Sequence, residues 1–400
     1  MKKRLLLALL LLLALAGAAW AASEALPASQ WAQQFPDQYN SFMRNAENSE
    51  TYDYVAAHPQ IAVLYEGSGF GYSYYAARGH EYTLEDVKNI ERPHPIANCL
   101  TCKSGDYTAM VNKMGDAAYQ LPFDETINQL AGGISCYNCH GNEVPTLQVT
   151  HGYLADAIKE EDSIKPATLA CAQCHVEYYF PDESKATVLP YDGHANATPE
   201  SIYAYYQQLG FADFTNPRTG AKMIKVQHPE FETYTGKGSV HGGMFSCADC
   251  HMGKPKNEEG KRYSSHFLAS PVKSPEIAAT CAGCHEDLEG FVKDIQDKTE
   301  ERTYQIADKL VVLTNALADK VAAGAAEEEL DKLRALNREA QFYWDFVFVE
   351  NSEGAHNRKL TTQCLDKAEE LADQVAIIRQ GLPACPGRPL FYEMFQEDIL

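Results

Sequence analysis

Ten of the twelve cysteines in this 400-residue chain occur as five pairs, and two residues separate the thiols of each pair. The pairs are Cys99/Cys102, Cys136/Cys139, Cys171/Cys174, Cys247/Cys250 and Cys281/Cys284. Four pairs are followed directly by a histidine, and these histidines are His140, His175, His251 and His285. Since roughly 0.01 such C-x-x-C-H matches are expected by chance at this composition, the pattern indicates a specific chemistry.

That chemistry is the attachment of haem. Two thiols at this spacing can each form a thioether with one vinyl group of the same porphyrin, and the adjacent histidine can place an imidazole nitrogen on the iron. Paired C-x-x-C units also build zinc sites, but zinc does not require a histidine directly after each pair. Disulfide redox pairs occur singly, near a βαβ pattern. The four motifs therefore predict four covalently attached c-type haems.

The fifth pair, Cys99 and Cys102, has the same spacing but is followed by Lys103. Among four intact motifs, this unchanged spacing predicts a fifth haem c whose iron is bound by lysine instead of histidine. A lysine amine binds iron only when it is neutral, so the metal and burial must hold Lys103 unprotonated. The alternative is a degenerate motif with a solvated lysine.

The histidine count allows the four C-x-x-C-H haems to be closed on both faces. A haem that only transfers electrons is usually six-coordinate, so these four haems need four more axial ligands. Nine of the thirteen histidines remain after the proximal ones, and methionine would also serve while raising the potential. The count does not say which four residues are used.

The segments that hold these motifs differ in composition and in the periodicity of their apolar residues. Residues 23–98 are rich in aromatic residues and show few periodicities, and the motifs between Cys99 and His285 recur at irregular intervals, which excludes a solenoid. After His285, apolar residues at helical spacing predict helices over about 286–322, 325–348 and 363–380. We therefore expect a mainly α multihaem cytochrome fold with little β structure, with haems in the N-terminal and central part and long C-terminal helices.

We predict three regions. A positive start (Lys2, Lys3, Arg4), a Leu/Ala run and the small residues Ala19 and Ala21 indicate a signal peptide over residues 1–21, and hence a periplasmic protein. An uncleaved anchor is the alternative. Residues 22–285 form the pentahaem catalytic region, and residues 286–400 form a long-helix region that either packs within the monomer or makes a dimer interface.

Charge and the two remaining cysteines add two expectations. The net charge of −21, made more negative by ten haem propionates, excludes nucleic-acid binding through a general basic face.

Cys364 and Cys385 either form a disulfide in an oxidising compartment or remain as free buried thiols.

The order of one C-x-x-C-K and four C-x-x-C-H motifs resembles cytochrome c nitrite reductase, the ammonia-forming pentahaem family. The resemblance covers roughly residues 67–356. Besides the cysteines, it rests on Arg78-Gly79-His80, on the run from Cys171 to Phe180, on Lys225–Glu230, on Val240-His241-Gly242 and on Gly354–Asn357.

The resemblance also implies roles for individual residues. Lys103 would be the proximal ligand of the active-site haem, and Arg92, Tyr178 and His228 would line the open face of that haem. The distal ligands of the other four haems would be His80, His241, His266 and His356. Glu177, Tyr178, Lys225 and Gln227 would surround one calcium ion, the tyrosine and lysine through their carbonyl oxygens, and such oxygen ligands suit a hard cation. His94 competes with Arg92 for the role of local proton donor.

The implied activity is the six-electron reduction of nitrite to ammonium at the lysine haem, fed by four bis-histidine haems. Nitrite would bind opposite Lys103, Arg92 and His228 would hydrogen-bond its oxygens, and His228 and Tyr178 would relay protons. The electron donor would be a membrane quinol-oxidising multihaem cytochrome or a soluble multihaem cytochrome, and the enzyme would be a homodimer. Two alternatives are pure electron transfer with five closed haems, and a related enzyme acting on hydroxylamine, sulfite or tetrathionate.

Overall fold

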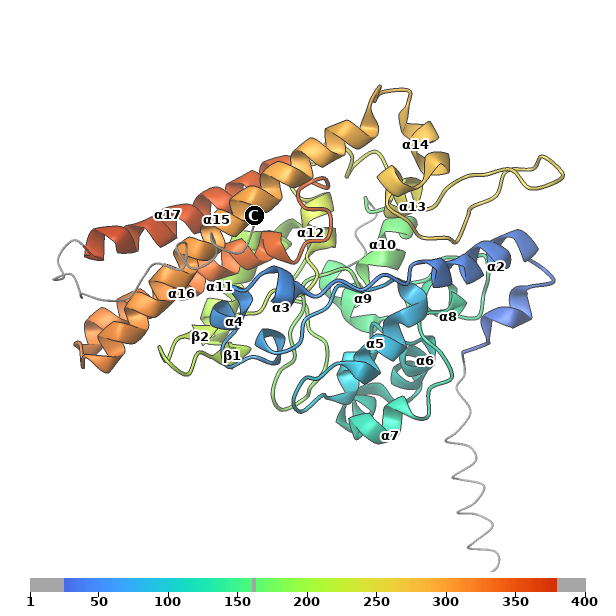
Figure 1. The fold of residues 1–400 in the computed structure, drawn as a ribbon. Coiled ribbons are helices and arrows are strands. Elements are labelled where there is room, and N and C mark those ends of the chain that lie inside the picture. The colour runs from blue at the N-terminus through green and yellow to red at the C-terminus, as the bar shows by residue number, and fades with distance from the viewer. Residues whose placement is uncertain (1–24, 160–162, 380–400) are drawn as a thin grey trace, which may run out of the picture.

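The computed structural model describes residues 25–159 and 163–379. The predicted signal peptide and Cys385 lie outside this part of the chain. Short helices and turns make up most of the region before residue 285 (Figure 1). These helices are α2 (Pro36–Met43), α3 (Tyr54–Ala57), α4 (Ile61–Leu64), α5 (Thr83–Asn89), α6 (Gly105–Met114), α7 (Phe123–Ile127), α8 (Cys136–His140), α9 (Gly152–Ile158), α10 (Pro166–Ala172), α11 (Pro199–Leu209), α12 (Glu230–Thr235), α13 (Cys247–His251) and α14 (Pro275–Cys281).

The described β-strands form one antiparallel pair, β1 (Phe214–Thr215) and β2 (Lys222–Met223), in which Phe214 is opposite Met223, and the other β pairings are four isolated bridges. The prediction of a mainly α fold with little β structure is thus confirmed. Within the described residues, no helix combines the length with the apolar character that crossing a membrane requires.

Helix α11 shows how local sequence fixes an element that the site depends on. The Thr198 hydroxyl accepts a hydrogen bond from the Ser201 amide (3.2 Å), Pro199 occupies the first turn, and Gly210 ends the helix at φ +65°. A hydroxyl cap, an early proline and a left-handed glycine are the usual signals of helix start and stop. The helix buries Tyr206, whose hydroxyl reaches Glu177.

Three long helices form the C-terminal part, α15 (Leu288–Ala322), α16 (Glu327–Phe348) and α17 (Arg358–Arg379), and they lie side by side in Figure 1. The first two confirm the predicted ranges to within two residues. The third begins five residues earlier than predicted, because the Asn357 side chain accepts a hydrogen bond from the Leu360 amide (3.1 Å) and caps a polar first turn.

The largest hydrophobic cluster joins both ends of the described chain. Ile61, Leu64 and Tyr65 of the N-terminal segment are at most 1% exposed and belong to the same cluster as the buried faces of α15, α16 and α17. A second, smaller cluster consists of Ala97, Leu100, Tyr107 and Ile127. This second cluster holds the Cys99–Lys103 motif against α6 and α7.

Candidate active site

The C-x-x-C motifs lie in or beside short helical turns. Two complete motifs are helices in themselves, α8 (Cys136–His140) and α13 (Cys247–His251), and the serine before each forms a capping box with the residue at the third position. Residues three and four apart share one helix face, so the two thiols and the histidine point to a common side. None of the ten motif thiols, all in the described part of the chain, forms a disulfide.

One motif cysteine departs from the arrangement of the others. Cys284, predicted to hold a haem together with Cys281, is exposed to solvent, whereas the other nine motif cysteines are partly buried. The reason is local, because α14 ends at Cys281 and the turn over residues 282–284 lies at the surface. The structure therefore does not place Cys284 in an enclosed haem site. Its attachment to haem stays a prediction, and a haem held there would be open to solvent at that edge.

Each motif histidine lies opposite one of the four predicted distal histidines. The ring centroids are 6.3 Å apart for His80/His175, 6.2 Å for His140/His266, and 6.1 Å for both His241/His285 and His251/His356. With metal–nitrogen bonds of about 2.1 Å and centroids about 1.1 Å beyond the nitrogens, two imidazoles on opposite sides of one metal atom are roughly 6.3 Å apart. The spacing of all four pairs therefore fits a haem iron between two rings.

His175 has a second histidine neighbour at the same distance. Its ring centroid is 6.3 Å from that of His228 as well as from that of His80. Distance alone therefore leaves two residues as candidates for the second ligand of the His175 iron.

Hydrogen bonds orient several of these rings. The Nδ1 atoms of His140, His251 and His266 lie 3.0–3.1 Å from backbone carbonyl oxygens, and Nδ1 of His356 lies 2.6 Å from Glu350 Oε1. A partner on Nδ1 fixes the tautomer and leaves Nε2 free to bind a metal. His151, in contrast, has partners for both ring nitrogens, namely Gln173 Oε1 and the Thr101 carbonyl.

The motifs also lie next to one another. The thiols of Cys102 and Cys174 and a ring nitrogen of His151 are within 4.8 Å of one another, a grouping that could hold a metal ion. Both cysteines belong to C-x-x-C motifs, and His151 already has two hydrogen-bond partners. We therefore attribute this grouping to two neighbouring haem motifs and not to a separate metal site. The Cys171 thiol is in turn close enough to the Cys247 thiol for the two to influence each other's pKa. The structure thus places the motifs beginning at Cys99, Cys171 and Cys247 in a row.

The residues predicted to line the open face converge on the Cys99–Lys103 motif from three different loops. The Arg92 guanidinium lies 3.7 Å from the centre of the Phe70 ring, donates to the Ser73 carbonyl (3.0 Å), and is close enough to Cys99 and Tyr178 to interact electrostatically. His228 interacts in the same way with Lys103. His94, the rival of Arg92, is exposed.

Burial governs the protonation of this group. It lowers the pKa of His228 to about 4, against the opposing effect of the Glu230 carboxylate. It also raises the pKa of Tyr178 well above its usual value. Nδ1 of His228 is buried without a hydrogen-bond partner among the described residues and lies 3.9 Å from Glu230 Oε1. A neutral imidazole with an unsatisfied nitrogen can accept a hydrogen bond from a bound molecule.

The predicted calcium ligands also lie together. The Gln227 amide donates to Glu177 Oε2 (2.6 Å), and the Gln227 side chain donates to the Lys225 carbonyl oxygen (2.9 Å). Glu177 is 0% exposed, and burial raises the pKa of its carboxyl well above the usual value. A hard cation would hold this carboxylate ionised, so the oxygen-rich set fits calcium.

Two acidic side chains near the predicted substrate and calcium residues were not predicted from the sequence. Glu230, on the first turn of α12, lies 3.9 Å from both His175 and His228. Glu232 accepts hydrogen bonds from the Glu177 amide (3.0 Å) and the Tyr191 hydroxyl (2.9 Å), and burial raises the pKa of its carboxyl to about 8. Glu230 belongs to the Lys225–Glu230 run on which the resemblance rests. The roles of both acids become visible only through their contacts with segments that are distant in the chain.

The family model described as cytochrome c552 matches residues 28–384 of the chain. Among solved structures, the chain is similar to the catalytic subunit NrfA of the cytochrome c nitrite reductase from Desulfovibrio desulfuricans, a protein with two calcium sites. The two are 30% identical with a TM-score of 0.79, over 90% of this chain and 87% of that one.

Two larger cytochromes match less well. The outer cell wall cytochrome OcwA is 24% identical with a TM-score of 0.42, over 73% of this chain and 48% of that one. An undecahaem cytochrome from the S-layer of Carboxydothermus ferrireducens is 18% identical with a TM-score of 0.41, over 75% of this chain and 41% of that one.

Proposed function

The chain belongs to the cytochrome c552 family, and from this membership we propose that it is a cytochrome c nitrite reductase that reduces nitrite to ammonium with six electrons. One observation supports the site of this reaction most directly. Arg92, Tyr178 and His228 converge on the motif that ends in lysine, whereas each motif that ends in histidine has a second histidine ring across from it.

We propose that five haems are attached through the ten motif cysteines, with Lys103 as the proximal ligand of one of them. When bound, the haems supply the redox chemistry and the iron that takes up nitrite. The chain's own residues bind and protonate the substrate. The Arg92 guanidinium, held by Ser73 and Phe70, donates hydrogen bonds to the nitrite oxygens, which favours cleavage of the N–O bonds.

Proton delivery is the second task of the chain. His228 and Tyr178 lie beside the Cys99–Lys103 motif, and both carry exchangeable protons. Glu230 is within reach of His228, so it can stabilise the imidazolium each time His228 takes up a proton. Together these residues can pass protons to the bound nitrogen compound while it stays in the site.

Electron delivery follows from the row of motifs. A single redox centre cannot hold six electrons, so they must arrive one after another. The adjacency of Cys102 to Cys174, and of Cys171 to Cys247, supports a chain of closed haems that leads to the lysine site.

The proposal is tested by supplying a reduced dye to the haem-loaded protein and measuring nitrite consumption together with ammonium formation. A pyridine-haemochrome assay on the same sample counts the haems. We expect ammonium equal to the nitrite consumed and five haems per chain. A sample that consumes no nitrite, or forms no ammonium from it, would refute the activity.

A pair of variants separates the two histidine neighbours of His175. We expect His80→Ala to open a second haem, so that two of the five irons become high-spin, because it removes an axial ligand. His228→Ala should keep a single high-spin iron, because His228 serves the substrate instead. Electron paramagnetic resonance counts the high-spin centres, and the opposite assignment of the two variants would contradict the proposal.

We also propose that one calcium ion is held by Glu177, Gln227 and the carbonyl oxygens of Tyr178 and Lys225. Glu177→Gln removes the negative charge, its amide oxygen still accepts from the Gln227 backbone N–H, and its NH2 group donates to the Tyr206 hydroxyl, which can also act as an acceptor. Binding at about 100 times the dissociation constant stabilises a protein by about 2.7 kcal/mol. Calcium should therefore raise the unfolding midpoint of the parent protein, whereas the variant should show no calcium-dependent rise.

The matched control for this test is Glu183→Gln, which removes the same charge from an exposed position. It should retain one calcium per chain by atomic emission. Retention of calcium by Glu177→Gln would show that the ion is held elsewhere.

Location and assembly are parts of the same proposal. A signal over residues 1–21 supports export to the periplasm, where a membrane quinol-oxidising cytochrome or a soluble multihaem cytochrome would donate electrons. Phe291 and Val312 are exposed apolar side chains on α15, and they support a homodimer through the long helices. Sedimentation of the haem-loaded protein measures the assembly.

A further inference from the structure

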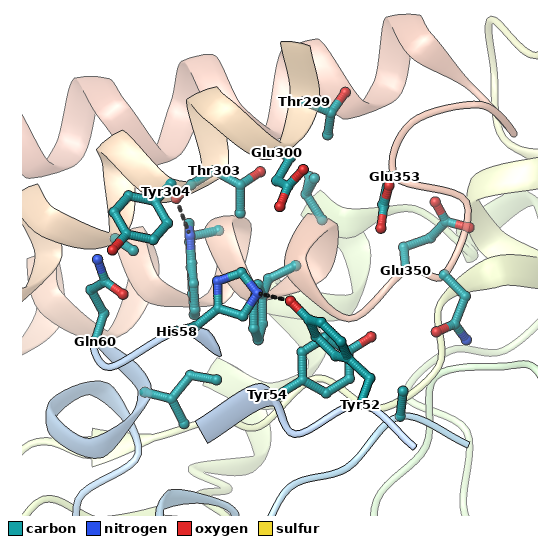
Figure 2. Close-up of a pocket in the computed structure, with 17 residues that line it drawn as sticks. Tyr52, Tyr54, His58, Gln60, Thr299, Glu300, Thr303, Tyr304, Glu350 and Glu353 are labelled. Carbon is teal, nitrogen blue, oxygen red and sulfur yellow. Dashed lines mark hydrogen bonds between the residues drawn. The ribbon is translucent and has the colours of Figure 1, made fainter. Parts of the chain in front are cut away.

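A pocket of about 360 Å³ lies between the N-terminal segment and helices α15 and α16 (Figure 2). Its lining comes from residues 52–76, from residues 299–307 of α15 and from residues 344–353 at the end of α16 and just beyond it. Volumes of 300–1,000 Å³ are typical of small-molecule sites. None of the motif cysteines or their histidines lines it, nor do Arg92, Lys103, Tyr178 and His228. The pocket is therefore separate from the proposed nitrite site.

Aromatic rings form much of its wall. Tyr52 and Tyr304 are partly exposed, at 46% and 41%, whereas Trp344 is 1% exposed. The Tyr52 and Tyr54 rings meet edge to face with centroids 5.1 Å apart, and Trp344 stacks on Phe348 with centroids 4.6 Å apart. Aromatic faces attract cations, and several of them around one space form the cages that bind quaternary ammonium groups.

The charges of the pocket have one sign. Glu300, Glu350 and Glu353 line it, whereas its lining contains no lysine or arginine among the described residues. His58 is its one basic side chain, and burial lowers the pKa of this imidazole. Glu350 is already hydrogen-bonded to His356 and Ser352. Glu300 and Glu353 therefore supply the negative field for a bound molecule.

Two buried acceptor atoms in the lining lack hydrogen bonds. Gln60 and Thr303 are each 8% exposed, and Gln60 Oε1 and Thr303 Oγ1 have no partner among the described residues. The amide nitrogen of Gln60 is used by Asp308 Oδ1 (2.7 Å), so its free oxygen is an acceptor only. Leaving a buried acceptor unsatisfied is costly, and a ligand with an O–H or N–H group would remove that cost.

We propose that this pocket binds a small organic cation that combines an ammonium group with a hydrogen-bond donor. The aromatic rings and the carboxylates of Glu300 and Glu353 hold the positive charge. Gln60 and Thr303 accept the hydrogen bond from the donor group. A bare ammonium ion, close in size to a water molecule of about 30 Å³, would leave most of the pocket unfilled. A metal ion would need a shell of oxygens in place of the ring faces.

The probe is choline, which carries both groups, and its neutral isostere 3,3-dimethyl-1-butanol keeps the shape and the hydroxyl without the charge. We expect titration calorimetry on the haem-loaded protein to show one saturable choline site per chain. The isostere should bind at least tenfold more weakly. Tyr52→Leu and Glu300→Gln should each raise the choline Kd at least about fivefold, because each removes one part of the cation site.

Two matched variants control for fold and net charge. Tyr72→Leu removes another exposed tyrosine, and Glu301→Gln removes the neighbouring carboxylate on α15, and neither residue lines the pocket. Both should keep the choline Kd within twofold. Equal affinity for the isostere, equal effects of the control variants, or no saturable binding would each overturn the proposal. The readout is binding alone, so the outcome does not depend on nitrite turnover.

Discussion

Lys103→His is expected to lower nitrite turnover about 100-fold while leaving five haems attached. We propose that Cys99 and Cys102 hold this haem, and the substitution leaves both cysteines in place, so the haem content should not change. An amine only donates electron density to iron, whereas an imidazole also withdraws it. The identity of the axial ligand therefore changes the reduction potential of the haem. Changing groups around a catalytic metal typically costs ten- to a hundredfold in activity, and we place this residue at the upper end because we propose that it binds the iron itself.

The measurement is kcat for nitrite with a reduced dye, normalised to haem content by pyridine haemochrome. Lys88→His is the matched control, because Lys88 is an exposed lysine at the end of α5 and belongs to no cysteine motif. It should turn over nitrite at the parent rate. Full activity in Lys103→His with five haems would show that lysine is not required at this position.

Lys225→Met is expected to give the largest loss of stability, about 3–5 kcal/mol. The Lys225 ammonium lies 3.2 Å from both carboxylate oxygens of Asp345, and the two side chains are 2% and 0% exposed. Asp345 also accepts hydrogen bonds from the Val226 amide (2.9 Å) and from the Tyr65 hydroxyl. Removing one member of a buried ion pair leaves the other charge unpaired in a medium of low dielectric constant, which costs about this much.

Urea unfolding of the haem-loaded protein, followed by circular dichroism, measures this effect. Lys222→Met on β2 is the control, since Lys222 is exposed three residues earlier in the same segment. Replacing both partners, as Lys225→Met with Asp345→Leu, should recover part of the loss, because no buried charge then remains. A change below about 1 kcal/mol for Lys225→Met would contradict the prediction.

The same ion pair explains why sequence reasoning missed a part of the site. Lys225 was assigned a role only through its carbonyl oxygen, yet its side chain ties the segment before His228 to helix α16. Asp345 lies in a helix whose apolar spacing predicted the helix itself but gave no sign of a buried acid. The pairing exists only because α16 packs against this segment.

The haem motifs were readable from sequence because their ligands are contiguous. Two thiols and a histidine within five residues are brought together by a single helical turn, so spacing alone predicts the cofactor. Spacing does not predict how deeply each thiol is enclosed, and the exposed position of Cys284 follows only from where α14 ends in the fold. The long helices were equally readable, because a buried stripe recurs with the helical period over many residues, as along α15 and α16.

The second histidine of each pair depended on tertiary structure. The histidine count gave nine candidates, and only packing brings His266 opposite His140 and His356 opposite His251, while it turns His151 to a glutamine and a carbonyl. Arg92, Tyr178 and His228 likewise come from separate loops, which no spacing rule connects. Sequence by itself therefore predicted which groups are attached and where, because that chemistry is local. Tertiary structure decided which residues face them, because those contacts join segments far apart in the chain.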